Sequence, residues 1–78
     1  MEIYLNSMSR IKKFIGIASK YETDIDLVSG RFIVDAKSIL GIFSLDLSKP
    51  LTVVATDKNE EEKLFKEISK FTTYAKVA

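Results

Sequence analysis

Cysteine and histidine are among the residue types missing from this 78-residue sequence. The lack of cysteine excludes disulfides, thiolate metal sites and cysteine nucleophiles. The lack of histidine removes the commonest general base, the commonest metal ligand and any phosphoryl group carried on an imidazole. Together the two absences favour a binding or regulatory protein over an enzyme, and they predict no metal and no other cofactor.

Long apolar runs and an excess of either charge are missing as well. No apolar stretch reaches the roughly 18 residues of a membrane span. The first residues, Met1 to Asn6, lack the basic start and apolar region of a signal peptide, so we expect a cytoplasmic location. A formal net charge of +1 gives no overall drive towards nucleic acid. The length predicts a single domain over residues 1–78, with one modest core.

The first third of the chain shows a strand pattern followed by a helix pattern. Apolar and polar residues alternate over residues 1–6, which predicts a strand. A helix is expected from there to about Lys20, with Ser7 or Ser9 as its cap. Its apolar positions share one face and are Ile11, Phe14, Ile15 and Ala18. Its basic residues stay outside that face and are Arg10, Lys12, Lys13 and Lys20.

The rest of the chain adds a hairpin, two helices and a strand. The β-rich runs 24–28 and 31–36 flank Ser29 and Gly30, which predicts a hairpin with a tight turn. A strand follows at 51–55, and Asn59 with Glu62 resembles a capping box for a last helix. The buried face of that helix should consist of Leu64, Phe65, Ile68 and Phe71. Residues 72–78 are expected to form a frayed tail.

The order strand, helix, strand, strand, helix, strand, helix predicts an α+β open-faced sandwich. Such a fold has a four-stranded, mostly antiparallel sheet with three helices on one face. Within it, Ser38 can cap a short helix that has ended before Pro50. We expect Ile42 and Leu45 on the core side of this helix, whereas three apolar residues fall largely on another side, namely Ile39, Leu40 and Phe43.

Three segments resemble HPr, the histidine-containing phosphocarrier of the bacterial phosphoenolpyruvate-dependent sugar phosphotransferase system. They are Ala18–Tyr21, Asp24–Ile25 and above all Asp35–Leu45, which is Asp-Ala-Lys-Ser-Ile-Leu-Gly-Ile-Phe-Ser-Leu. The last is a fairly specific signature, because it joins a strand end, a regulatory serine and an interaction helix. The resemblance extends without a gap from Phe14 to about Ala55, and it implies a role connected with this system.

The chain departs from the HPr pattern before its first helix. In the family, a loop after the first strand carries Gly-(Ile/Leu)-His-Ala-Arg-Pro-Ala, in which the histidine accepts phosphate and the arginine helps to bind it. Counting back from Ala18 puts Ser7 in the place of the histidine and Ser9 in that of the arginine. Several residues of the loop are expected to be missing. We therefore expect a divergent member without the phosphoacceptor histidine, and Ser7 and Ser9 as helix caps in a degenerate phosphoacceptor region.

The resemblance also implies a docking surface. Ser38 matches the serine that a dedicated kinase phosphorylates in Gram-positive members, and its alternative role is that of a cap alone. Ile39, Leu40 and Phe43 match an exposed apolar patch that contacts enzymes and regulators, with Lys20 at its rim. The alternative is that these residues are buried against a neighbouring element or a second copy of the chain. The basic residues of the first helix are either a solvated face or a contact for acidic partners.

Three functional hypotheses follow. The first is a regulatory or adaptor module that binds proteins and does not transfer phosphoryl groups on histidine. The second is a metabolic sensor phosphorylated on Ser38, and the third is a homo-oligomeric structural protein such as a homodimer. The expected partners are proteins, namely HPr kinase, phosphotransferase components or a transcription regulator. Neither nucleic acid nor a metal is expected, because an aromatic platform is absent and adjacent carboxylates of a helix do not converge.

Overall fold

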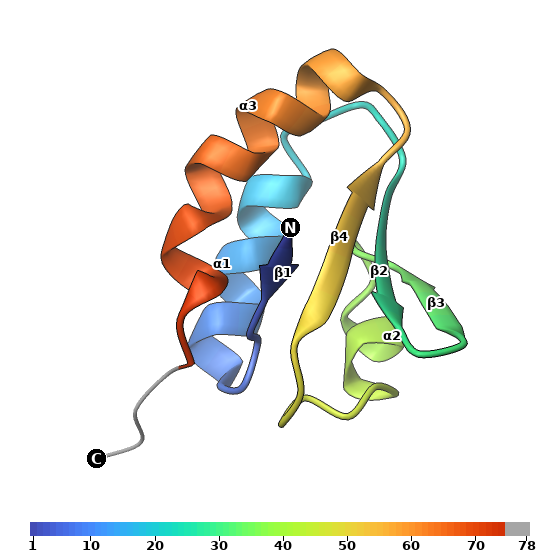
Figure 1. Cartoon of the computed structure of the whole chain (residues 1–78), viewed down its shortest axis with the longest axis vertical. Coiled ribbons are helices and arrows are strands. Elements are labelled where there is room, and N and C mark those ends of the chain that lie inside the picture. Colours follow the sequence, from blue (N-terminus) through green and yellow to red (C-terminus); the bar gives the residue numbers. More distant parts are fainter. Residues whose placement is uncertain (75–78) are drawn as a thin grey trace.

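The computed structural model describes residues 1–74, and its helices and strands follow the predicted order (Figure 1). They are β1 (Glu2–Ile3), α1 (Met8–Ala18), β2 (Ile25–Ser29), β3 (Phe32–Asp35), α2 (Ile39–Phe43), β4 (Leu51–Ala55), α3 (Lys58–Ile68) and the short 3₁₀ helix η1 (Ser69–Thr72). The strands form one sheet in the order β1-β4-β2-β3, and all three pairings are antiparallel. Of the expected tail, residues 75–78 lie outside the described part of the chain.

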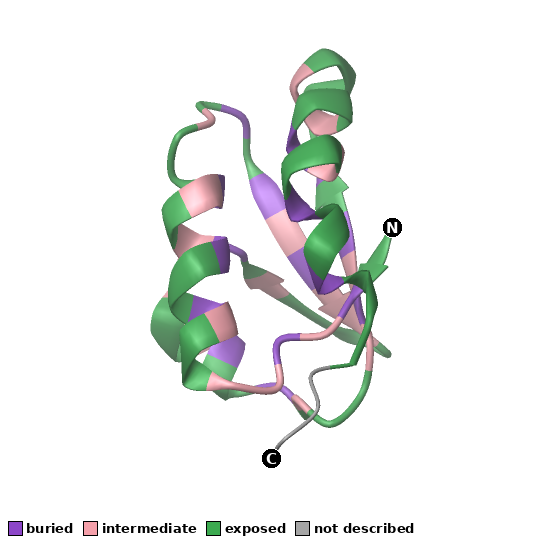
Figure 2. Ribbon diagram, turned by 90° about the vertical axis from the view of Figure 1, so that its left-hand side faces the viewer, coloured by how far each residue is buried: buried purple, intermediate pink, exposed green. Residues whose placement is uncertain are grey.

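The core lies between one face of the sheet and the three helices. Alternate residues of the central strands, such as Leu27 and Val53, are buried together with Phe14 of α1, Ile42 of α2 and Leu64 of α3. Figure 2 shows buried positions on the inner sides of the elements and exposed positions on their outer sides. Because buried residues of every helix join this one cluster, the other face of the sheet is left open. The predicted open-faced α+β sandwich is confirmed.

The hairpin between β2 and β3 turns at Gly30, one residue later than the predicted Ser29-Gly30 turn. Gly30 has a φ of 59°, and it is the one residue with a positive φ among those described. Ser29 pairs with Phe32, so the loop consists of Gly30 and Arg31. A two-residue hairpin loop with a positive φ at its first position alone fits a type II′ turn, for which glycine is preferred.

Two predicted elements are shorter than expected at their ends. The first strand covers Glu2–Ile3 rather than residues 1–6, because the chain turns away and the Tyr4 N–H donates to the carbonyl of Phe71 at 2.8 Å. Helix α1 ends at Ala18 rather than near Lys20. There the N–H groups of Lys20 and Tyr21 donate to carbonyls three residues back, which tightens and ends the helix.

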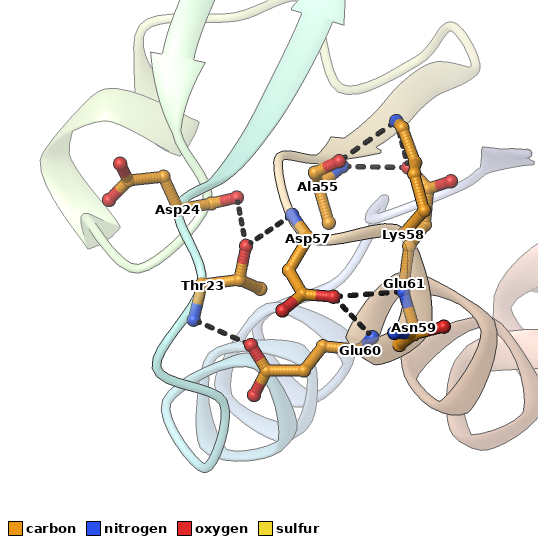
Figure 3. Close-up of polar contacts among 8 residues, drawn as sticks. All are labelled: Thr23, Asp24, Ala55, Asp57, Lys58, Asn59, Glu60 and Glu61. Carbon is orange, nitrogen blue, oxygen red and sulfur yellow. Dashed lines mark hydrogen bonds and ion pairs between the residues drawn. The ribbon is translucent and has the colours of Figure 1, made fainter.

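The start of α3 corrects the predicted capping box. The cap is Asp57, whose carboxylate accepts the N–H groups of Asn59 and Glu60, and not Asn59 with Glu62. Figure 3 shows that the neighbouring carboxylates are used for tertiary contacts. Glu60 accepts the Thr23 N–H at 3.1 Å, and Glu61 accepts the Ala55 N–H at 2.8 Å. These bonds connect α3 to the end of β4 and to the loop before β2.

Thr23 is the buried polar residue in this region, with 8% of its surface exposed. Its hydroxyl accepts the Asp57 N–H at 2.8 Å and donates to the Asp24 carbonyl at 3.3 Å (Figure 3). Burying a hydroxyl is costly unless it is hydrogen-bonded, and here both functions are used. The three residues Thr23, Asp57 and Glu60 therefore form a satisfied polar cluster at one end of the molecule.

Within residues 1–74, no helix combines the length and the apolar character needed to cross a lipid bilayer.

Candidate interaction surface on helix α2

Helix α2 begins at the predicted serine cap. Ser38 has extended backbone angles, φ −104° and ψ 113°, and its Oγ accepts the Gly41 N–H at 3.1 Å. The Ser38 carbonyl accepts the Ile42 N–H at 3.0 Å. At the other end, the Ser44 hydroxyl donates to the Gly41 carbonyl at 2.6 Å. Both ends of this five-residue helix are thus capped by serine side chains, which compensates for its small number of internal hydrogen bonds.

The connection from β3 to α2 is also fixed by side chains. The Asp35 carboxylate accepts the Lys37 N–H at 2.8 Å, and the Asp35 carbonyl accepts the Ser38 N–H at 3.0 Å. The ammonium group of Lys37 donates to the carbonyls of Tyr21 and Thr23, at 2.7 and 3.0 Å. Lys37 therefore links the start of α2 to the loop that follows α1. The sequence pattern placed this lysine in the family signature without indicating its structural role.

Gly41 lets α2 lie directly on the sheet. A Cβ atom built at this position would lie 3.3 Å from Cβ of Val34 and 3.4 Å from Oγ of Ser38. An added Cβ would be in tight contact, so Val34 or the helix would have to move by a few tenths of an ångström. Glycine therefore favours close packing here, and its φ is not unusual.

The two sides of α2 differ sharply in exposure. Ile42 is fully buried and Leu45, just beyond the helix, is 8% exposed, so their predicted place in the core is confirmed. In contrast, Leu40 is 80% exposed, Phe43 46% and Ile39 41%. We call Ile39, Leu40 and Phe43 the α2 patch. The structure brings these three predicted residues together on one short helix directly after Ser38, and it leaves them uncovered by the described part of the chain.

Lys20, the predicted rim of the α2 patch, makes its ion pair elsewhere. Its ammonium lies 2.7 Å from the Glu67 carboxylate, on α3. The Tyr21 hydroxyl donates to the same carboxylate, and this hydrogen bond is the main reason why the pKa of Tyr21 rises to about 12. The pKa of Glu67 is lowered, first by the hydrogen bond from Lys20 and then by that from Tyr21. Lys20 therefore helps to hold α1 against α3, and the contact to Glu67 was not foreseen from the sequence.

The predicted degenerate phosphoacceptor region lies at the start of α1. Ser7 is the N-cap, and its Oγ accepts the Arg10 N–H at 3.2 Å, as predicted for one of the two serines. Ser9 is exposed on the first turn. Among residues 1–74, no group of three or more acidic, cysteine or histidine side chains is placed to hold a metal ion.

The prediction that all basic residues of α1 lie on its outer side is wrong for Arg10. Lys12 and Lys13 are exposed, but Arg10 is half-buried. Its Nη1 donates to the Tyr4 carbonyl at 3.0 Å and to the Thr73 carbonyl at 2.6 Å. The guanidinium carbon lies 5.7 Å from the centre of the Phe71 ring, which is a cation–π distance. Arg10 thus connects α1 to both ends of the described chain.

Comparisons with known proteins agree with this geometry. The family model described as "PTS HPr component phosphorylation site" matches residues 9–73. The crystal structure of HPr-C-His from Thermoanaerobacter tengcongensis superposes with a TM-score of 0.73 at 30% sequence identity, over 96% of this chain and 94% of that chain. A comparison with curated proteins gave no match.

A second solved structure shows the same fold. It is Crh, the catabolite repression containing protein of Bacillus subtilis, described as a dimer with a swapped domain. It has a TM-score of 0.68 over 100% of this chain and 90% of that chain. At 21% identity this likeness concerns the fold alone. The match of the family model over residues 9–73 is the decisive finding: the chain belongs to the HPr family of the phosphotransferase system.

Proposed function

We propose that this chain is a cytoplasmic regulatory or adaptor protein of the phosphotransferase system that binds partner proteins through the α2 patch. One observation carries the proposal. A helix fixed by serine caps, Lys37 and Gly41 displays Leu40 at 80% exposure with Ile39 and Phe43 beside it. Exposed apolar side chains on a rigid support suit a docking surface, because little conformational freedom is lost on binding. We take residues 1–78 to act as a single HPr-like domain.

The second part of the proposal is that this protein does not carry phosphate on histidine. The sequence contains no histidine, and Ser7, which counting back from Ala18 puts in the place of the phosphoacceptor, is the cap of α1. A serine hydroxyl without a neighbouring base is a poor substitute for an imidazole nucleophile. The chain would then keep the docking half of an HPr protein without its chemistry.

The phosphoryl-transfer half is tested with the first enzyme of the phosphotransferase system and phosphoenolpyruvate. The protein should remain unphosphorylated, while an HPr protein with its histidine becomes labelled in the same tube. Acid-labile phosphate on this chain would contradict the proposal.

The docking half is tested by binding to phosphotransferase components, HPr kinase and transcription regulators of the system. Leu40→Ser should weaken the binding that the unchanged protein shows, whereas Val54→Ser, on the open face of the sheet, should not. Both side chains are exposed, so both variants should fold. Equal effects of the two substitutions would assign binding to another surface.

A second candidate function rests on Ser38. Its Oγ lies at the start of α2, beside the patch, and accepts the Gly41 N–H. A phosphate on this oxygen would add charge next to Ile39 and Leu40 and so change which partners dock there. Incubation with an HPr kinase and ATP tests this role of a metabolic sensor that binds a transcription regulator. Absence of phosphate on Ser38 would reject it.

The third candidate is a homo-oligomer in which the α2 patch is an interface between copies. The dimer described for Crh motivates it for a chain of the same fold. Sedimentation of the unchanged protein as a monomer at all concentrations would reject this role and leave the docking proposal intact.

A further inference from the structure

Strand β3 forms an edge of the sheet and is exposed on both sides. Phe32 and Ile33 are each 66% exposed, and they point to opposite faces of the strand. Figure 1 shows β3 at the outer margin of the sheet, with no helix of the described chain beyond it. An edge strand with apolar residues on both faces is a template for pairing with another strand. Proteins normally avoid such an edge unless it is used.

The pattern of hydrogen bonds shows which groups of β3 face outwards. The Ala36 N–H donates to the Ile25 carbonyl at 2.9 Å. In an antiparallel pair, residues alternate between those bonded to the neighbour and those turned away. Phe32 and Val34 therefore direct their backbone groups towards β2, whereas Ile33 and Asp35 direct theirs towards the open edge.

Negative charge at this edge favours a partner strand that carries a basic side chain. Asp35 lies directly opposite Asp26 of β2, and like charges opposite each other in a sheet are unfavourable. The ion pairs among residues 1–74 involve neither of these carboxylates. A strand that carried a basic residue to Asp35 would relieve this repulsion.

We propose that β3 pairs with β3 of a second copy of this chain, antiparallel and around a two-fold axis, with Ile33 opposite the second copy's Ile33. In this register Phe32 lies opposite the second copy's Val34, which gives the exposed ring an apolar neighbour. Asp35 lies opposite the second copy's Arg31, and the symmetry forms that pair twice. The result is a continuous eight-stranded sheet, since each copy contributes its four strands.

Neighbouring registers fit the edge less well. A shift of two residues in one direction brings Arg31 opposite the second copy's Lys37, which is a pair of like charges. A shift in the other direction places Asp35 opposite the second copy's Ser29, so the carboxylate gains no cation. The sequence of the edge strand thus selects the self-complementary register.

The pairing uses the edge of the sheet and not the α2 patch, so it does not depend on the proposed docking function. Binding of a partner to α2 could fail while the dimer persists, and the reverse also holds.

Sedimentation velocity between about 10 µM and about 1 mM tests the pairing, a range that covers weak self-association. The unchanged protein should shift from monomer to dimer as its concentration rises. Ile33→Lys should abolish the dimer, because two ammonium groups would meet at the axis. Leu40→Lys is the matched control, since Leu40 is also exposed but belongs to helix α2 and not to the edge strand. A monomer throughout the range overturns the proposal, as does a dimer that survives Ile33→Lys.

A charge exchange tests the register independently of Ile33. Arg31→Glu places two acids opposite each other, Asp35→Lys places two bases opposite each other, and each should raise the dimer dissociation constant about tenfold. The double variant Arg31→Glu with Asp35→Lys restores opposite charges and should recover most of the loss. If the losses of dimer affinity from the two single variants simply add in the double variant, the proposed register is wrong. Thermal unfolding at low concentration separates these effects from a change in monomer stability.

Discussion

The starts of α1 and α2 have the same local chemistry and opposite surroundings. In both helices a serine with extended backbone angles accepts the N–H of the residue three positions later, at 3.2 Å for Ser7 and 3.1 Å for Ser38. The residue at that later position differs. In α1 it is Arg10, whose side chain binds the ends of the described chain, and in α2 it is Gly41, which has no side chain.

This difference explains why one helix start is closed and the other open. Arg10 covers the ring of Phe71 and connects α1 to Tyr4 and Thr73. Gly41 instead allows α2 to approach β3, which turns Ile42 inwards and leaves Leu40 outside. A serine cap alone therefore does not mark a binding surface. The residues that follow it decide whether the helix start serves the fold or can serve a partner.

The largest effect should come from removing the anchor of α2. Ile42→Ala should lower the free energy of unfolding by about 3 kcal/mol, because a fully buried branched side chain is replaced by a cavity. Leu40→Ala, on the exposed side, should change it by less than about 0.5 kcal/mol. Urea unfolding measures both. Similar losses would show that the α2 patch is packed in solution and not free to dock.

The next largest loss of stability is expected at the closed start of α1. Arg10→Ala should destabilise the protein by about 2 kcal/mol, because two carbonyls lose a charged donor and Phe71 loses its cation. Lys13→Ala on the exposed side of α1 is the matched control and should be nearly neutral. If urea unfolding gives the same small value for both, Arg10 does not join the ends of the described chain as inferred.

The two serine caps should have smaller and equal effects. Ser7→Ala and Ser38→Ala should each cost about 1 kcal/mol, the usual value for an N-cap. The two sites share no partner in the structure, so the double variant should lose about 2 kcal/mol. A clearly larger loss for Ser7→Ala would mean that this serine also supports the contacts of Arg10.

The smallest effect is a change in pH dependence at the other end of α1. The folded protein holds the proton of Tyr21 up to a pKa of about 12, above the ordinary value of 10.0. The unfolded chain loses that proton first, so this contribution to stability is complete below pH 10 and is lost as the pH rises to about 12. Tyr21→Phe should flatten the fall in melting temperature over this range. An unchanged alkaline profile would contradict the bond to Glu67.

In acid, the contacts of Glu67 make stability depend on pH in the opposite direction, so that stability is lost as the pH falls. The lowered pKa of Glu67 means that its contribution is present above the ordinary value of 4.5 and is lost as the pH falls through the folded-state pKa. Tyr21→Phe should reduce this acid loss only in part, because Lys20 remains as the first cause of the shift.

Local patterns predicted the elements of this fold well. Strand β4 has the bounds expected from its β-branched residues, and Ser38 caps α2 as its spacing indicated. Ile42 and Leu45 are in the core as expected, because the helical period puts the two residues on one side and the structure turns that side towards the sheet. The HPr signature at Asp35–Leu45 also identified the family that the comparison found.

Local patterns did not predict contacts between residues that are far apart in the sequence. Nothing near Glu60 in the sequence shows that its carboxylate accepts the N–H of Thr23, 37 residues away. Arg10 was placed outside for the same reason, since its partner Thr73 lies 63 residues away. The cap of α3 is a different case, because Asp57 with Glu60 has the same local spacing as the expected pair Asn59 and Glu62, and spacing alone did not show which pair starts the helix. The roles proposed for the α2 patch and Ser38 depend on partners, which one chain does not contain.

The two carbonyl bonds of Lys37 have a practical consequence for chemical labelling. An amine-reactive reagent should acylate the exposed Lys12 and Lys13 before Lys37, whose ammonium is shielded by the carbonyls of Tyr21 and Thr23. Once acylated, Lys37 would lose its charge and could no longer hold both carbonyls. A reporter dye coupled at low reagent excess should therefore leave α2 undisturbed, whereas exhaustive acylation would detach the start of α2 from the α1–β2 loop.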